Sequence, residues 1–285
     1  MKTIKEIYSA LYGNYKNDDS YFDRVMQCND TEYIPKVSNA GDVIESGDEK
    51  HQVMHNGVLI HEGCYHQSWV TEIITALKGH HEPQEEKLFY EILKYVPKNG
   101  TMIELGSFWA YYSLWFNKEI SDARNIMVEP NPFKADIGRN NFQLNEFDGE
   151  FLDAYVGDSY EEKSAYTDEV GNYNIPRVSV DWLLDHYSID KVDILHADIQ
   201  HNEMKLLNGS SKSLSDNKID FIFLATHSNQ VHQAIRDNLG YHDYHILEEY
   251  YPHQSFFDDG LVLACSSDVI LDIDTSKLKT SKKDW

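Results

Sequence analysis

The segment Thr101 to Ser113, TMIELGSFWAYYS, constrains the fold more than any other part of the chain. Apolar residues surround Glu104, and Gly106 then gives the backbone freedom to turn. From Ala110 onward the apolar residues resume with helical spacing. The pattern predicts a buried strand that runs through a tight turn into a helix.

A second apolar strand, NIMVEPNP at 125–132, sharpens this interpretation. It ends in Glu129, which follows Glu104 by 25 residues. In doubly wound sheets, a carboxylate at the mouth of the next parallel strand can accept both hydroxyls of a ribose. We therefore expect Glu129 to bind the ribose of an adenosine cofactor.

The glycines indicate which adenosine cofactor this turn accommodates. A dinucleotide turn needs G-x-G-x-x-G, so that backbone amides can approach a pyrophosphate. Here Gly106 is followed by Ser107 and then by bulky residues up to Trp109. This favours S-adenosylmethionine, with Glu104 facing the cofactor's amino group, and disfavours a nicotinamide oxidoreductase.

The composition and net charge limit the kinds of molecule that the chain is expected to bind. The chain of 285 residues has 48 acidic and 25 basic side chains and a formal net charge of −23. Such a surface repels a phosphate backbone, so nucleic acid is not expected as a partner. We expect no export signal and no membrane span, because the longest apolar stretches are strand-sized. Three widely spaced cysteines predict reduced thiols and a cytoplasmic location.

Strand and helix patterns alternate from about residue 83, as in a parallel sheet covered by helices. The count predicts an α/β class I methyltransferase (Rossmann-like) fold, a doubly wound sheet of seven strands with the last antiparallel. A polar stretch at 159–177 is expected to be a surface insertion. The expected strands are 101–105, 125–129, 150–156, 192–198, 221–226, 241–249 and 261–266, and the expected helices include 133–145, 180–187 and 231–239.

The chain is expected to divide into three parts. Residues 1–79 form an N-terminal cap over the cofactor and substrate face, with a short helix at 69–77. For residues 38–52 the alternative is a loosely ordered extension. Residues 80–267 form the S-adenosylmethionine-binding domain, and 268–285 form a charged tail.

Residues 101–266 resemble the FkbM family of S-adenosylmethionine-dependent methyltransferases. ELGSFWAYYSLWF resembles its strand-turn-helix motif, VEPNP its ribose-binding strand end, and VSVDWLLDHYSIDKVDILHADIQHNEMKLLNG its long fourth-strand block. The resemblance implies methyl transfer to a hydroxyl of a sugar, a polyketide or a similar small molecule. By position it implies a methionine side with Glu104, Gly106 and Ser113, a ribose side with Glu129 and Asn131, and an adenine contact from Asp158.

The chain departs from the family pattern at two places. Ala110 stands where the family usually has a glycine, which crowds the turn. The family's Lys-Ile-Asp-Val-Glu-Gly block reads His-Ala-Asp-Ile-Gln-His at 196–201. The family pattern therefore does not assign roles to these side chains, and we infer their roles from their own chemistry.

That chemistry predicts a His/Asp cluster. His196 and Asp198 lie two apart at a strand end and so share a face, and His227 ends the next strand. Together they can hold a divalent ion, with imidazoles favouring Mn, Fe, Co or Zn over Mg. Catechol-type O-methyltransferases have a similar layout, with a base three residues after the fourth-strand aspartate, where this chain has His201. Alternatively, one histidine is the base and no metal binds.

The motif GHHEPQEE at 79–86 is a further candidate for ligand contact. Its histidines and acids, together with Gln84, cluster at a helix N-terminus ahead of the first strand, from which they could reach the cofactor or substrate. The alternative is a helix-capping arrangement with exposed histidines.

The sequence therefore predicts an S-adenosylmethionine-dependent O-methyltransferase. Its acceptor would be a small hydroxylated molecule, a sugar or glycosylated metabolite, with the His/Asp cluster supplying a base and a divalent metal site. The alternative is a noncatalytic cofactor-binding or regulatory module on the same fold. Whether the chain forms a homo-oligomer is left open.

Overall fold

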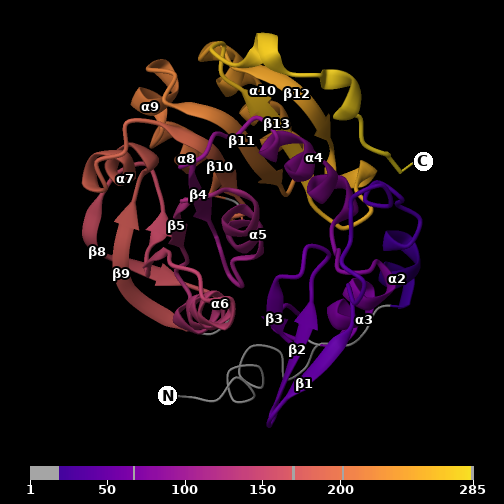
Figure 1. Ribbon diagram of the computed structural model, residues 1–285. Coiled ribbons are helices and arrows are strands. Elements are labelled where there is room, and N and C mark those ends of the chain that lie inside the picture. The colour runs from indigo at the N-terminus through magenta and orange to yellow at the C-terminus, as the bar shows by residue number, and fades with distance from the viewer. Residues whose placement is uncertain (1–18, 67, 169–170, 201, 284–285) are drawn as a thin grey trace.

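The computed structural model describes residues 19–66, 68–168, 171–200 and 202–283, and its centre is a seven-stranded sheet (Figure 1). The strands are β4 Thr101–Leu105, β5 Arg124–Val128, β6 Glu150–Leu152, β10 Val192–Ala197, β11 Ile219–Thr226, β12 His245–Tyr250 and β13 Gly260–Cys265. Their order is β12-β13-β11-β10-β4-β5-β6. Strand β13 is antiparallel to both neighbours, and the other neighbouring pairs are parallel. The predicted doubly wound sheet is confirmed.

Helices cover both faces of this sheet, as parallel strands require. Strand β11 shows the result, because all eight of its residues are buried. One face packs on helices α4 Pro83–Leu93, α5 Tyr111–Glu119 and α6 Pro132–Leu144. The other face packs on helices α7 Val180–His186, α8 Glu203–Asn208, α9 Ser211–Ser215 and α10 Asn229–Tyr241.

Two expected strand boundaries were wrong. Helix α10 continues to Tyr241, because Ile235 and Leu239 keep its helical spacing into the core, so β12 begins only at His245. The expected third strand is split into β6 and β7 Tyr155–Val156. Strand β7 belongs to another sheet, in the order β7-β9-β8, with β8 Glu161–Thr167 and β9 Asn172–Val178. The polar stretch expected to be a surface insertion thus supplies two paired strands.

The N-terminal segment forms its own three-stranded sheet beside the main one (Figure 1). Strands β1 Val43–Ser46, β2 Glu49–Val53 and β3 Leu59–His61 pair in that order, next to helices α2 Asp19–Val25 and α3 Ser68–Ala76. The alternative of a loosely ordered extension at 38–52 was therefore wrong. The side-chain amide of Gln52 ties this sheet to α3 by donating to the carbonyl of Thr71 at 2.9 Å.

The C-terminal segment packs against the body of the protein. It contains the short 3-10 helices η2 Ile270–Asp272 and η3 Thr275–Lys277, and the side chain of Leu278 is buried. The Ser281 N–H donates to the Asp30 carboxylate at 2.8 Å. None of the helices in the described ranges combines the length and apolar character needed to cross a membrane.

Candidate active site

A cavity of about 530 Å³ lies at the carboxyl ends of β4, β5, β10 and β11. This volume suits a cofactor together with a small acceptor. Residues of α2, α3, α4 and the loop before β13 complete its wall. Ten aromatic side chains, seven acidic side chains and one lysine from the described residues line it, so acids outnumber lysines and arginines there.

The turn after β4 forms the floor of this cavity. Gly106 has a φ of +77°, and a Cβ added there would collide with the carbonyl oxygen of Asp198. Only glycine allows β4 and β10 to approach so closely. The hydroxyl of Ser107 is buried and has no hydrogen-bond partner among the described residues, which leaves it for a ligand. Ala110 has a φ of +60°, which fits the expected crowding, because this region favours glycine.

Glu129 lies where the ribose of an adenosine cofactor is expected. It is 5% exposed, and its two oxygens accept the N–H groups of Phe108 at 3.1 Å and Asn131 at 2.9 Å. Burial raises the pKa of its carboxyl to about 7. Each oxygen keeps a second lone pair, so the carboxylate can still accept two hydroxyls.

Glu104 lies on the neighbouring strand and also lines the cavity. Its carboxylate accepts the Ser113 N–H at 3.2 Å, and it stands opposite His196 in the β4–β10 register. Burial raises the pKa of Glu104 to about 7, although the charge of His196 partly opposes that shift. Ser113 thus contacts the Glu104 carboxylate through its backbone N–H.

Asn131 and Asp158 are not among the residues that line the cavity. The Asn131 side chain caps α6 by accepting the N–H groups of Phe133 and Lys134, and its amide donates to Asp168 at 2.8 Å. Asp158 is exposed and accepts a hydrogen bond from the Ser159 hydroxyl at 3.0 Å. The ribose and adenine roles of these two residues remain predictions.

Gln84 lines the cavity, but its amide is already engaged. It donates to the carbonyls of Gln254 at 3.3 Å and Ser281 at 2.7 Å, and accepts the Phe256 N–H at 2.8 Å. The side chain therefore fixes the loop before β13 and the C-terminal segment against α4. Any cofactor contact through Gln84 remains a prediction.

The two histidines of the GHHEPQEE motif are buried, so the expected alternative with exposed histidines was wrong. His80 and His81 both pair through Nδ1 with the Glu86 carboxylate, which also accepts the His81 N–H at 2.8 Å. Burial lowers the pKa of His81, but Glu82 and Glu86 outweigh it and raise the value to about 10. These ion pairs hold the N-terminus of α4 beside the cavity.

The same helix places Glu85 against His196. Their Oε1 and Nε2 atoms are 2.7 Å apart, and both side chains are buried. The other ring nitrogen of His196, Nδ1, is buried with no hydrogen-bond partner among the described residues. Burial lowers the pKa of His196, but Glu85 outweighs it, so the pKa is raised. A carboxylate that holds one nitrogen leaves the other able to accept a proton.

Asp198 and His227 meet as expected, and Asp259 joins them. His227 Nε2 is 3.2 Å from Asp198 Oδ1 and 3.5 Å from Asp259 Oδ1, and its Nδ1 is 2.5 Å from Glu203 Oε1. One ligand atom from each of Asp198, His227 and Asp259 lies within 4.8 Å of the others. His196 is not part of this group. Burial lowers the pKa of His227, but Asp198 and Glu203 outweigh it and raise the value to about 10.

Sequence reasoning missed the roles of Glu85 and Asp259. Glu85 was named within its motif, but its partner lies 111 residues away. Asp259 lies in a loop that the sequence marks only as a connection. The predicted base, His201, lies outside the described residues.

The strand order and the cavity at the carboxyl ends define a class I S-adenosylmethionine-dependent methyltransferase. The sequence matches the Methyltransferase FkbM domain family over residues 96–246, more than half of the chain. The protein belongs to this family, as its motifs indicated.

Solved structures with a similar arrangement are distant in sequence. Precorrin-6y C5,15-methyltransferase from Geobacter metallireducens is 12% identical with a TM-score of 0.44, and covers 66% of this chain and 89% of its own. TrmK from M. capricolum, in complex with S-adenosylhomocysteine, is 10% identical with a TM-score of 0.42, and the match covers 63% of this chain and 67% of TrmK. The ribosomal protein L11 methylase from Lactobacillus delbrueckii is 13% identical with a TM-score of 0.43, and the match covers 66% of this chain and 80% of the methylase. No curated protein gives a match. These likenesses carry no information about the acceptor.

Proposed function

We propose that this methyltransferase acts on a hydroxyl group of a small molecule, a sugar or a glycosylated metabolite. The observation that carries the proposal is the buried Glu85–His196 pair, which lines the same cavity as the cofactor-side residues Glu104 and Gly106. A neutral hydroxyl is a weak nucleophile and needs a base to accept its proton as it is methylated, whereas a neutral amine is nucleophilic without one. S-adenosylmethionine supplies the electrophilic methyl group when bound.

The cofactor would lie across the ends of β4 and β5. Glu129 would accept the ribose hydroxyls through its remaining lone pairs, and Glu104 would face the amino group of the methionine part. The unpartnered Ser107 hydroxyl supports a ligand at the turn between them. These contacts would fix the methyl group toward β10, where His196 lies. Positioning of this kind accounts for much of the rate in such reactions.

The base is assigned to His196. Glu85 at 2.7 Å orients the imidazole, and the free Nδ1 would take the proton of the acceptor hydroxyl. The sequence also makes His201, which follows Asp198 by three residues, a candidate for the base. The two assignments predict different variants to be slow, so they can be separated by experiment.

A divalent ion would be held by Asp198, His227 and Asp259. Two carboxylates and one imidazole suit Mn, Fe, Co or Zn, and also leave positions for acceptor oxygens. Such an ion would lower the pKa of a hydroxyl bound to it. His196 takes no part as a ligand here, because it does not belong to this group of ligand atoms.

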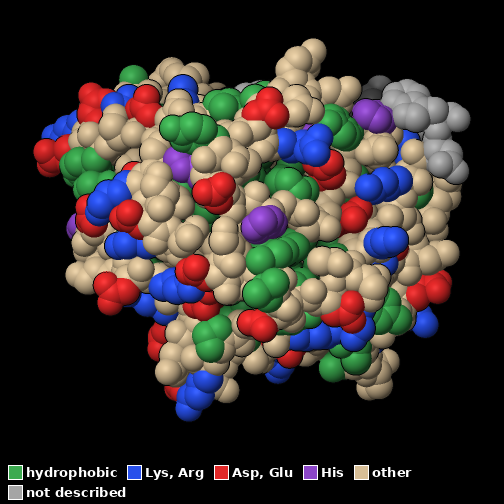
Figure 2. All heavy atoms as spheres, turned by 90° about the horizontal axis from the view of Figure 1, so that it is seen from above, with side chains coloured by type: hydrophobic (Ala, Val, Ile, Leu, Met, Phe, Trp, Pro, Cys, Tyr) green, Lys and Arg blue, Asp and Glu red, His purple; other side chains and the backbone are tan. Residues whose placement is uncertain are grey.

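Charge argues for a small molecule rather than nucleic acid. The cavity has seven acidic side chains and one lysine among its described lining residues. On the face in Figure 2, the Lys and Arg side chains of the described residues are scattered among acidic ones and form no continuous patch. A phosphate backbone needs such a patch for affinity.

The test is a screen of the purified enzyme with labelled cofactor against nucleotide sugars and free sugars. Once an acceptor is found, His196→Ala should lower kcat roughly 10²- to 10⁴-fold while S-adenosylhomocysteine binds normally. His245→Ala, which changes an exposed histidine, is the matched control. If His201→Ala is the slow variant instead, the base assignment moves to it. Cofactor binding without turnover on any acceptor would favour the noncatalytic module.

A further inference from the structure

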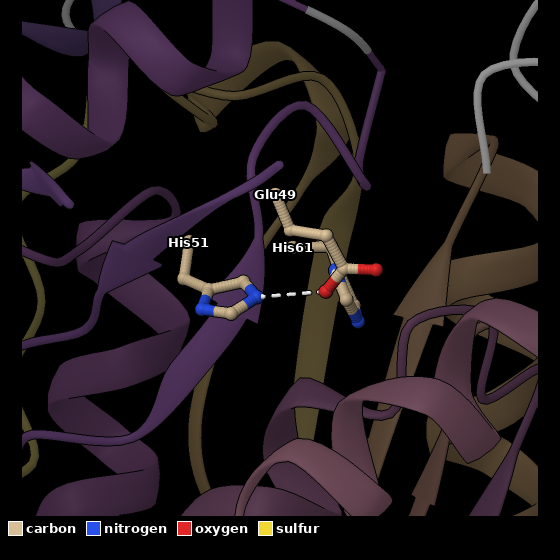
Figure 3. A group of neighbouring side chains, drawn as sticks. All are labelled: Glu49, His51 and His61. Atoms are coloured by element: carbon tan, nitrogen blue, oxygen red, sulfur yellow. Dashed lines mark hydrogen bonds and ion pairs between the residues drawn. The ribbon is translucent and has the colours of Figure 1, made fainter. Parts of the chain in front are cut away.

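Another group of metal-ligand side chains lies on the N-terminal sheet, outside the residues that line the cavity (Figure 3). His51 on β2 and His61 on β3 are directly paired in the antiparallel register. Glu49 lies two residues before His51 and therefore on the same face of the sheet. Figure 3 shows the Glu49 carboxylate facing the His51 imidazole, with His61 close to the carboxylate.

The separations of the ligand atoms suit a small cation. Glu49 Oε2 is 3.3 Å from His51 Nε2 and 4.0 Å from His61 Nδ1, and all three ligand atoms lie within 4.8 Å of one another. Tetrahedral zinc with bonds of about 2.0–2.2 Å places neighbouring ligand atoms roughly 3.3–3.6 Å apart. The Glu49–His51 separation already has this value, and small side-chain rotations would shorten the other separations to it.

The two imidazoles are largely buried, whereas the carboxylate is exposed to solvent. The side chains of His51 and His61 are 6% and 11% exposed, whereas that of Glu49 is 62% exposed. The sheet thus fixes the imidazoles, and the carboxylate can close over an ion that arrives from solvent.

The site has a physical connection to the cavity. The His61 N–H donates to the Asn141 side chain at 3.0 Å, and the amide of Asn141 donates to the carbonyl of Trp109 at 3.0 Å. Trp109 and Tyr65, which lies four residues after His61, both line the cavity. An ion on β2 and β3 would therefore stiffen a segment that lines the cavity.

We propose that Glu49, His51 and His61 bind one divalent transition-metal ion of the zinc type and that this ion fixes the N-terminal sheet. Two imidazoles and one carboxylate suit zinc, cobalt or iron and leave a fourth position for water. Calcium and magnesium prefer sites built of oxygen ligands. The proposal is independent of the acceptor and of any ion in the cavity.

Zinc titration of the full chain by calorimetry tests the site. The measurements use the Asp259→Asn background, which removes one carboxylate of the cavity group, and each variant is compared with that parent. One equivalent of zinc should bind. His51→Ala and His61→Ala should each weaken it beyond the roughly 10- to 100-fold loss typical of outer-shell partners. Glu49→Gln should also weaken it, and because this side chain is exposed the variant should fold normally. His245→Ala should bind as tightly as its parent.

Thermal unfolding gives an independent readout. Zinc should raise the Tm of the Asp259→Asn protein, because an ion that binds only the folded state stabilises it. The increase should vanish in His51→Ala and shrink in Glu49→Gln. Unchanged zinc affinity in Glu49→Gln and His61→Ala would overturn the proposal, as would a folded Asp259→Asn protein that binds no zinc.

Discussion

Replacing Glu104 by glutamine should stabilise the protein without cofactor and at the same time weaken cofactor binding. The side chain is 3% exposed, and burial raises the pKa of its carboxyl from 4.5 to about 7. A raised carboxyl pKa means that the folded state disfavours the charge. Glutamine has nearly the same shape and carries no charge. It can still accept the Ser113 N–H through its amide oxygen.

The size of the effect follows from the pKa. Below pH 4.5 the carboxyl of Glu104 is protonated in both the folded and the unfolded state, so its charge has no effect on stability. Between pH 4.5 and about 7 the unfolded chain ionises first, and the free energy of unfolding falls by about 1.4 kcal/mol per pH unit. Above pH 7 the full cost is present, roughly 3 kcal/mol for a shift of this size. The gain in Glu104→Gln should therefore be near zero at pH 4.5 and largest at pH 8.

Urea unfolding of the two proteins at pH 4.5, 6 and 8 measures this gain. Calorimetry with S-adenosylmethionine at pH 8 should show roughly 10- to 100-fold weaker binding, because a charge-assisted hydrogen bond worth about 1.5–3 kcal/mol is lost. A stability difference that does not change with pH would refute the electrostatic argument. Unchanged affinity in the stabilised variant would instead refute the placement of Glu104 against the cofactor.

Three further predictions concern the same cavity. Gly106→Ala should lower the free energy of unfolding by roughly 3 kcal/mol or more, because the new Cβ meets the Asp198 carbonyl. The control Gly47→Ala, with a φ of +64° and open space around it, should lower it by only about 1–2 kcal/mol. Equal losses in urea unfolding would contradict the crowding at Gly106. Glu129→Ala should weaken S-adenosylhomocysteine binding roughly 10- to 100-fold by calorimetry, and a folded variant with full affinity would remove the ribose assignment. Asp259→Asn should lower both the metal content of the cavity and turnover, and full activity in the presence of a chelator would reject that metal site.

The fold could be predicted because its signals are local. In β10 and β11 long apolar runs mark strands that are buried on both faces. The polar strands β1 and β2 gave no such signal, because VIES and EKHQV do not alternate clearly between apolar and polar residues.

The site could be predicted where it depends on strand ends. Glu104 and Glu129 come together because adjacent parallel strands end at one edge of the sheet. The partner of His196 could not be predicted, because it depends on how α4 docks against β10. For Asn131 a signal was present, since an asparagine before a proline is typical of a helix N-cap.

The acidic lining of the cavity bears on how a hydroxyl could react there. An alkoxide formed beside an ionised carboxylate such as that of Asp198 would be disfavoured, so a free alkoxide is a poor intermediate in this cavity. The proton must therefore leave as the methyl group arrives, to a base such as His196, or a cation must offset the new charge. Protonated His227, or a divalent ion that replaces its proton between Asp198 and Asp259, can supply that cation. Such a carboxylate attracts the cationic sulfonium of S-adenosylmethionine, and this attraction disappears once the methyl group has moved. We therefore expect S-adenosylmethionine to bind more tightly than S-adenosylhomocysteine, and calorimetry that finds the product bound more tightly would contradict this electrostatic account.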